Sequence, residues 1–273
     1  MPLNLVIDFP EDEDEPWVIE HRIFDVLSEY LQPTSQASPP EVALKFNELF
    51  QLNQRENEKA NPEGFLWQLW DIVFNVAEQV PYSHTSQDRL VELIAALRDA
   101  HFQPNPFAEL KCMGPALTER FNQISTEPPT SDDGEGSNPW KNLNALAARL
   151  TRAGFGVRSR DAVIAFSLAL ENRPHPRSRA YQERGRALNF HVPIAADWMQ
   201  KCARELYLQM KSGESVEGPP WKGKRGIFDE RWNFWKEQFG DIAEREDACE
   251  DAVREGARLA APKMIEAESS DDV

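Results

Sequence analysis

The stretch that decides the fold is PEGFLWQLWDIVFNVAEQVP, residues 62–81. Its polar residues Gln68, Asp71, Asn75 and Gln79 fall on one narrow stripe of an α-helix, and most other positions are apolar. A helix that is apolar over most of its circumference is surrounded by other helices. Because prolines at both ends are typical helix punctuation, the stretch predicts a central helix of a helical core.

The same helical period continues on both sides of this stretch. Alternating strand patterns are almost absent, and runs of β-branched residues are few. The segment after Pro81 offers Thr85 or Ser86 as an N-cap and carries a clean apolar face, which His101 continues at the helix end. That face consists of Leu90, Leu93, Ile94 and Leu97. The sequence therefore predicts an all-α fold, a single compact domain of about ten helices with irregular loops.

Composition suggests where this domain begins and ends. Residues 1–16 form an acidic N-terminal segment, residues 17–268 the all-α domain, and residues 269–273 a frayed tail. Residues 125–138 are rich in Gly, Pro, Ser and Asp and lack periodicity, which predicts a flexible internal linker. This linker either divides two helical domains or is an exposed loop within one.

The bulk composition excludes several classes of protein. A hydrophobic fraction of 41% with eight Trp provides enough apolar material for a core, which argues against wholesale disorder. The net charge of −16 repels phosphate backbones and anionic membrane surfaces, so nucleic-acid and membrane partners are not expected. No apolar run is long enough to span a membrane.

The N-terminus and the cysteines both indicate an intracellular protein. The first residues have no basic region and too short an apolar stretch for a signal peptide. Cys112, Cys202 and Cys249 are far apart and odd in number, which is typical of reduced thiols rather than a disulfide framework. We expect a cytoplasmic or nuclear location.

Residues 218–240 read GPPWKGKRGIFDERWNFWKEQFG, and either they form a functional site or they form part of the core. Phe228, Trp232, Trp235 and Phe239 recur at steps of four, three and four, so they share one face of a helix. Such stripes are usually core, with each indole N–H bonded to a carbonyl or carboxylate. The alternative is that the indoles line an apolar ligand pocket.

The first half of this stretch matches only part of a phosphate-binding loop. GPPWKGK fits the pattern G-x-x-x-x-G-K, but Arg225 stands where Ser or Thr would hold magnesium. Pro219 and Pro220 lack the N–H groups that cradle phosphate, and no strand precedes them. The sequence therefore does not predict nucleotide binding, and no cofactor is expected.

The sequence offers no catalytic constellation and no metal site. Its five histidines lack the spacing of metal ligands, and no nucleophile signature occurs. His101 is interpreted as a half-buried histidine at a helix end, with a general base at a pocket mouth as the alternative. Cys202 shares the Trp198/Leu206 side of its helix, which favours inert packing.

A basic cluster stands out in this acidic chain. Its members are Arg173, Arg177, Arg179, Arg184 and Arg186. Surface ion pairs with Asp and Glu elsewhere are the ordinary interpretation of such a run. The functional alternative is a patch that binds an anion, an acidic partner or the protein's own acidic N-terminus.

Several segments together resemble one family. They are FLWQLWDIVFNVAEQVPYSHTSQDRLVELIAALR, LTERFN followed by NPWKNLNALAARLTRAGF, VPIAADWMQKCARELY, and GPPWKGKRGIFDERWNFWKEQF. In order and spacing they are similar to the fungal proteins catalogued as domain of unknown function three-six-three-two, over most of residues 60–245. The resemblance implies an intracellular helical protein of filamentous fungi. Genes of the family sometimes neighbour natural-product pathways, and the family carries over no catalytic residues.

Two hypotheses for function remain open at this stage. The first is a non-catalytic binding or scaffold protein with an unknown protein or apolar small-molecule partner and an unassigned oligomeric state. The second is a cofactor-independent cyclase or isomerase of secondary metabolism, or a small-molecule-binding protein, in which an aromatic pocket holds one conformer of an apolar substrate. Its candidate lining residues are Trp67, Trp70, Trp198, Trp232 and Trp235, with His101 or Arg231 as a polar group.

Overall fold

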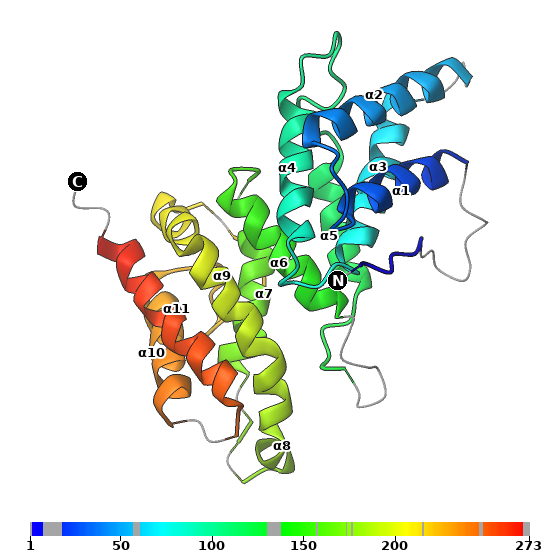
Figure 1. Ribbon diagram of the computed structural model, residues 1–273. Coiled ribbons are helices and arrows are strands. Elements are labelled where there is room, and N and C mark those ends of the chain that lie inside the picture. Colours follow the sequence, from blue (N-terminus) through cyan, green and yellow to red (C-terminus); the bar gives the residue numbers. More distant parts are fainter. Residues whose placement is uncertain are drawn as a thin grey trace. The chain divides into compact units, whose positions relative to one another are not determined.

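The computed structural model describes residues 2–7, 18–56, 61–129, 138–156, 158–172, 174–175, 177–214, 216–245 and 248–269. Within these ranges the chain forms eleven α-helices and one π-helix and no strand (Figure 1). The predicted all-α fold class is confirmed. Contacts divide the chain into two compact units, Met1–Leu146 and Ala147–Val273, with the boundary inside helix α6.

The first unit is built around the helix that the sequence singles out. Its helices are α1 (Val18–Leu31), α2 (Pro39–Glu56), α3 (Pro62–Ala77), α4 (Ser86–Asp99), α5 (Met113–Gln123) and the first part of α6 (Pro139–Arg152). Helix α3 packs against α1, α2 and α5. It begins as its sequence predicts, because the Asn61 side chain accepts a hydrogen bond from the backbone N–H of Glu63 at 3.0 Å and Pro62 follows directly.

The polar stripe of α3 differs from the sequence pattern at two positions. Asn75 is buried, and Gln79 donates to its side-chain oxygen at 3.1 Å. Trp67 is instead 39% exposed. Burial of the C-terminal half of the helix thus encloses one polar residue, while the first turns of α3 leave an aromatic ring at the surface.

Helix α4 has the predicted apolar face, and Thr85, one of the two predicted caps, occupies its N-cap position. The Thr85 side chain makes no capping hydrogen bond, and the Ser86 hydroxyl donates to the carbonyl of Leu31. His101 is exposed rather than half-buried. The reason is local: α4 ends at Asp99 and Ala100 is extended, so the helical stripe does not reach His101.

The predicted domain limits fall largely outside the described residues. Residues 8–16 of the acidic segment, residues 130–137 of the linker and residues 270–273 of the tail lie there. Residues 125–129 form no helix. Helix α6 begins at Pro139, directly after Asn138, whose side chain accepts from the N–H of Lys141 at 2.9 Å; a cap residue followed by proline is a helix start that the sequence predicts.

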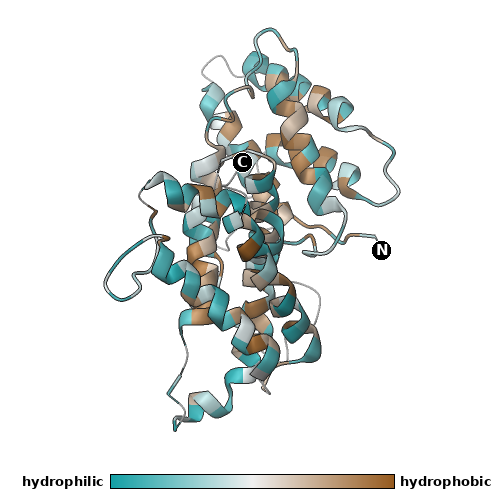
Figure 2. Ribbon diagram, turned by 90° about the vertical axis from the view of Figure 1, so that its left-hand side faces the viewer, coloured by the Kyte–Doolittle hydropathy of each residue, from teal (hydrophilic) through white to brown (hydrophobic). Residues whose placement is uncertain are grey.

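The second unit places a long helix against two C-terminal helices. After the last part of α6 it contains α7 (Ser159–Phe166), the π-helix η1 (Ser167–Glu171), α8 (Arg179–Gln182), α9 (Arg184–Ser212), α10 (Asp229–Arg245) and α11 (Asp251–Ser269). Helix α11 packs against both α9 and α10, and α7 and η1 pack against α9. Figure 2 shows hydrophobic residues following one side of the helices, as amphipathic helices require.

Helix α9 corrects one interpretation of the sequence. The sequence predicts that Pro193 opens this helix, but α9 begins at Arg184 and contains Pro193. Leu188, His191 and Val192 are buried, so packing of the segment before Pro193 outweighs the missing proline N–H. The backbone leaves helical geometry later, at Cys202.

The thiols and the hydropathy of the helices agree with the sequence. Cys112, Cys202 and Cys249 are not joined in disulfides. No helix in the described ranges has both the length and the apolar character that crossing a bilayer demands.

Candidate functional site

A buried ion pair organises the second unit. Glu171 ends the π-helix η1, and Arg231 lies in the first turn of α10. The Arg231 Nε donates to Glu171 Oε1 at 2.7 Å, and its Nη2 donates to Oε2 at 2.9 Å. The two side chains are 0% and 5% exposed, so both charges are removed from water and neutralise each other.

The same carboxylate satisfies a tryptophan of the aromatic stripe. Trp235 is fully buried, and its indole N–H donates to Glu171 Oε1 at 2.7 Å. The Arg231 guanidinium lies 5.2 Å from the Trp235 ring centre, and the Phe166 ring packs against the same indole with a centroid distance of 4.6 Å. Trp232, Trp235 and Phe239 are buried, as the core interpretation of the stripe predicts, whereas Phe228 is half-buried.

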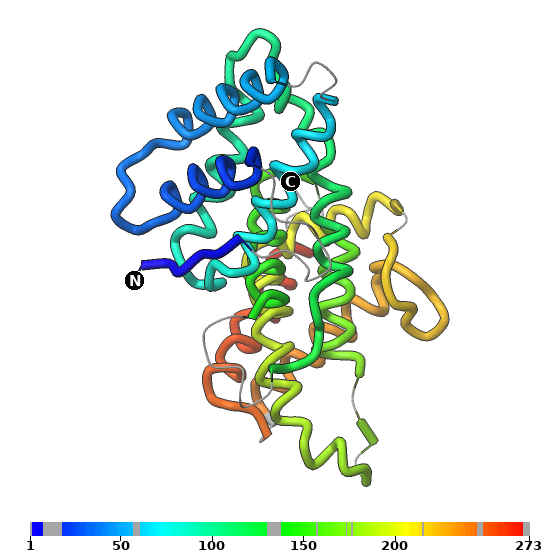
Figure 3. Tube along the Cα trace, turned by 90° about the vertical axis from the view of Figure 1, so that its right-hand side faces the viewer, coloured from blue at the N-terminus to red at the C-terminus, as the bar shows by residue number. Residues whose placement is uncertain are grey.

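Arg231 also holds the loop between α9 and α10. Its Nη1 donates to the carbonyl of Gly226 at 2.8 Å, and its Nη2 donates to the carbonyl of Pro219 at 3.0 Å. At Gly218 a Cβ would approach Val163 Cγ1 to 2.9 Å, so only glycine fits this close contact with α7. The two ends of the loop are therefore fixed to the core, and Figure 3 shows its middle projecting from the helices.

The projecting part is a tight turn with positive charges, here called the basic turn (residues 221–225). Trp221 and Lys224 exchange backbone hydrogen bonds of 2.8 and 3.0 Å. Lys222 and Gly223 between them have φ values of 49° and 81°, the signature of a type I′ turn. The partial phosphate-loop match is thus a two-residue turn, and no helix follows its lysine directly.

The cations of the basic turn face solvent, and two of them lie against aromatic rings. Lys222, Lys224 and Arg225 are exposed, and none has an ion-pair partner among the described residues. The Lys222 ammonium lies 4.1 Å from the Trp221 ring, and the Lys224 ammonium lies 5.4 Å from the Phe228 ring. The arrangement restricts the two lysines while leaving their charges accessible.

A cavity of about 330 Å³ adjoins the basic turn. Its cations are Arg225 and Lys211, and Lys211 pairs with Asp229 at 3.0 Å. Val216 and Ile227 supply buried apolar surface. The lining residues are Met210, Lys211, Gly213, Glu214, Val216, Arg225, Gly226, Ile227, Phe228 and Asp229.

The predicted pocket residues divide between the two units. Trp67, Trp70 and His101 belong to the first, and Trp70 is fully buried with its N–H bonded to the carbonyl of Lys111 at 2.8 Å. In the second, the structure brings Arg231 and Trp235 together. Trp232 and Trp198 are also buried there, and the Trp232 N–H donates to Glu268 at 2.8 Å. The cavity beside the basic turn is lined by none of these residues.

The predicted arginine patch lies around the short helix α8, apart from Arg173, which is outside the described residues. Arg177 and Arg186 are exposed. Arg179 pairs with Glu183 at 2.8 Å, and Arg184 stacks on Tyr181 with its guanidinium 4.0 Å from the ring centre. Part of this positive charge is therefore used within the segment itself.

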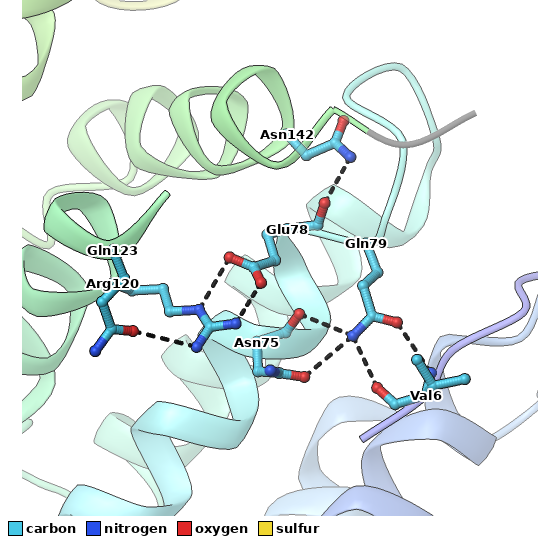
Figure 4. A network of polar contacts seen from close by, with 7 residues as sticks. All are labelled: Val6, Asn75, Glu78, Gln79, Arg120, Gln123 and Asn142. Atoms are coloured by element: carbon cyan, nitrogen blue, oxygen red, sulfur yellow. Dashed lines mark hydrogen bonds and ion pairs between the residues drawn. The ribbon is translucent and has the colours of Figure 1, made fainter. Parts of the chain in front are cut away.

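A second polar network belongs to the first unit (Figure 4). Glu78 at the C-terminal end of α3 receives both Arg120 Nε, at 2.9 Å, and Arg120 Nη2. The carbonyl of Glu78 accepts from the Asn142 amide at 2.8 Å. Gln79 exchanges two hydrogen bonds with the backbone of Val6, of 2.9 and 2.8 Å.

This network closes the end of a buried helix. The Asn142 side-chain oxygen accepts from the N–H of Tyr82 at 2.8 Å, and the Gln87 amide donates to the carbonyl of Val80 at 2.8 Å. The last carbonyls of α3 have no partner within the helix, so side chains from α4 and α6 supply donors. We assign it a structural role.

Sequence reasoning missed Glu171 and the basic turn. Glu171 is the last residue of the stretch RDAVIAFSLALE, residues 160–171, so a charge at the end of a mostly apolar helix was the available signal. The lysine-glycine pair between Trp221 and Lys224 was the signal for a type I′ turn. The charge at Glu171 does not identify Arg231 as its partner, because the two residues are sixty positions apart in the sequence.

Comparison with known proteins identifies a family. The model of the family described as "Protein of unknown function (DUF3632)" matches residues 70–239, which is more than half of the chain and confirms the resemblance seen in the sequence. The matched region contains Glu171, Arg231 and the whole basic turn. No curated protein and no solved structure matches the chain.

Proposed function

The chain belongs to the DUF3632 family, and we propose that it is a helical binding protein that docks an acidic protein segment on its basic turn. The observation that carries this proposal is the contrast between the turn and its support. A fully buried, bidentate ion pair fixes a loop whose tip presents three accessible cations. Rigid presentation lowers the entropy lost on binding.

Charge complementarity favours an acidic partner. The whole chain has a net charge of −16, so three exposed cations without ion-pair partners in the described residues form a local exception. The negative field of the remaining surface repels nucleic acid, which depends on extended phosphate contacts. An acidic peptide segment needs only the local cations.

The adjoining cavity supports a partner that also carries an apolar side chain. Val216 and Ile227 offer apolar surface beside Arg225. A leucine or phenylalanine flanked by Asp or Glu would fill this volume while its neighbours reach the basic turn. Binding would then combine an apolar anchor with charge-assisted hydrogen bonds at its rim.

The test uses a labelled synthetic peptide in which glutamates flank one leucine, with fluorescence anisotropy as the readout. We expect saturable binding that weakens with salt and is lost in Lys222→Glu/Lys224→Glu. The matched control is Arg177→Glu/Arg179→Glu, which makes the same charge change at the start of α8 and just before it, and leaves binding intact. Equal loss in both variants would show only the effect of net charge and would defeat the proposal.

The aromatic-pocket alternative, an isomerase or cyclase, stays a prediction. Two of its residues, Trp232 and Trp235, have their N–H groups bonded to Glu268 and Glu171. A pocket between these rings would have to open on binding. Turnover of an apolar polyene or polyketide probe by the purified chain, abolished in Trp232→Ala, would favour it over the binding role.

A further inference from the structure

Helix α9 bends at an unusual residue. Proline is the common cause of a sharp bend, yet the backbone of α9 leaves helical geometry at Cys202, with φ −143° and ψ 34°, and not at Pro193. The departure divides α9 into two helical parts at Cys202, which directs attention to the surroundings of this residue.

The thiol of Cys202 supplies a hydrogen-bond donor at the bend. Cys202 is fully buried, and its Sγ donates to the carbonyl of Trp198 at 3.2 Å. In a regular helix this carbonyl accepts from the N–H of residue 202. Burial raises the pKa of the Cys202 thiol, which keeps the proton needed for donation. At the bend, the Trp198 carbonyl therefore still has a hydrogen-bond donor.

A cleft of about 240 Å³ lies directly beside the bend. Its wall from α9 includes Met199 and Ala203 on either side of Cys202, and Ala267 of α11 faces the same space. Arg152, at the end of α6, completes the lining. The volume is below the roughly 300–1,000 Å³ typical of pockets for drug-sized ligands, so it fits a smaller molecule.

The charges of the cleft are biased toward cations in an acidic chain. Lys201 pairs with Asp197, and Lys263 pairs with Glu266 at 2.6 Å. The remaining two cations of the lining are Arg152 and Arg204, and neither has an ion-pair partner in the described part of the chain. Glu205 lines the cleft as well.

We infer that this cleft binds a small organic oxyanion that also carries a hydroxyl or amino group. Arg152 and Arg204 offer planar forks that match a carboxylate or phosphate. Glu205 accepts a hydrogen bond from the donor group of the ligand. The apolar part of the wall, which includes Ala203 and Ala267, contacts its carbon skeleton. The site is independent of the basic turn, since the two cavities share no residue.

The experiment is an NMR titration of the ¹⁵N-labelled chain with citrate, phosphoethanolamine and inorganic phosphate at constant ionic strength. Citrate carries only carboxylates and phosphoethanolamine only a phosphate, so the two distinguish the sources, and inorganic phosphate lacks the carbon skeleton. We expect saturable shifts confined to residue 152 and to residues 199–205 and 263–267, with an organic probe binding more tightly than inorganic phosphate. Both arginines are exposed, so their substitution leaves the fold intact.

Variants decide whether the cleft is the site. Arg152→Gln/Arg204→Gln should weaken binding by about tenfold or more, the equivalent of one lost charge-assisted hydrogen bond. Arg177→Gln/Arg179→Gln also removes two positive charges, at exposed positions that do not line the cleft, and should leave the affinity unchanged. Glu205→Gln should weaken the organic probes and not inorganic phosphate. Absent or non-saturating shifts, or equal affinity in the double variant, would overturn the inference.

Discussion

Each unit buries an arginine–carboxylate pair, and the two pairs differ in what they hold. In the first unit, Arg120 meets Glu78 at the end of α3, within a network that supplies donors to helix carbonyls. In the second, Arg231 meets Glu171 and extends two further hydrogen bonds to a surface loop. The first pair completes a core, whereas the second connects a core to an exposed charged turn.

This contrast shows how a buried charge pair can be interpreted. Replacing such a pair with apolar side chains is often neutral for stability, so stability alone does not account for it. A hydrogen-bond network that ends inside the core is explained by the polar groups it satisfies. A network that ends in a surface loop fixes the position of that loop, which suggests that the loop has a role in binding.

The largest expected effect comes from Arg231→Met. Glu171 would stay buried without its cation, and loss of one partner of a buried pair destabilises by about 3–5 kcal/mol. Urea denaturation measures the change in the free energy of unfolding. Glu171→Leu/Arg231→Met should recover part of that loss, because no charge remains buried. A double variant as unstable as the single one would contradict the assignment.

Low pH should lower the stability of the fold through His191 in the second unit. Burial lowers the pKa of His191 to about 4, and its Nδ1 has no partner among the described residues. An unfolded histidine titrates near 6.5, so the unfolded state binds more protons between these values. Stability present above pH 6.5 is therefore lost progressively toward pH 4, by up to about 3 kcal/mol.

The matched variant for this pH effect is His191→Gln, which cannot titrate. Denaturation curves between pH 7 and pH 4 should fall less steeply in the variant than in the parent chain. Probes in the second unit should report the acid transition before probes in the first. Identical slopes for both chains would show that other groups control the response.

Arg120→Met tests the other half of the comparison. The Arg120 and Glu78 side chains are 11% and 8% exposed, so this pair is slightly more exposed to solvent than Arg231 and Glu171. Loss of these charge-assisted hydrogen bonds should destabilise by about 1.5–3 kcal/mol. The amide resonances of the basic turn should not move. Shifts at Trp221 or Lys224 in this variant would mean that the turn does not depend on Arg231 alone.

The smallest effects come from two glycines with opposite expectations. Gly223 has φ 81° in the basic turn, so Gly223→Ala should destabilise by about 1 kcal/mol. Gly240 lies inside α10 with open space where a Cβ would lie, and Gly240→Ala should stabilise by roughly 0.5–1 kcal/mol. Thermal denaturation of the pair checks both signs, and equal signs would refute the turn geometry.

The fold class follows from local patterns that the sequence displays openly. The apolar circumference of residues 62–81 and the stripe of Trp232, Trp235 and Phe239 both specify buried helices without reference to distant residues. The Asn138 cap depends on residues within one helical turn, and the family resemblance depends on the order and spacing of sequence segments. Helical stripes and caps depend on residues one or two helical turns away, and these residues can be read directly from the sequence.

The site depends on long-range pairing, which periodicity does not encode. Glu171 finds Arg231 across sixty residues, and the early start of α9 is decided by burial of Leu188 and His191 rather than by Pro193. The bend at Cys202 has no sequence signal, because the thiol acts as a donor only in the folded helix. His101 was misplaced because one extended residue removed it from its stripe.

The most direct test of the central claim is amide hydrogen exchange at Trp221 and Lys224 in Glu171→Leu/Arg231→Met. We predict that this variant keeps much of its stability but loses protection at both amides and loses affinity for the acidic peptide. Retained protection and unchanged peptide binding would contradict a role for the buried pair in holding the basic turn. The pair would then be part of the core alone, as in the first unit.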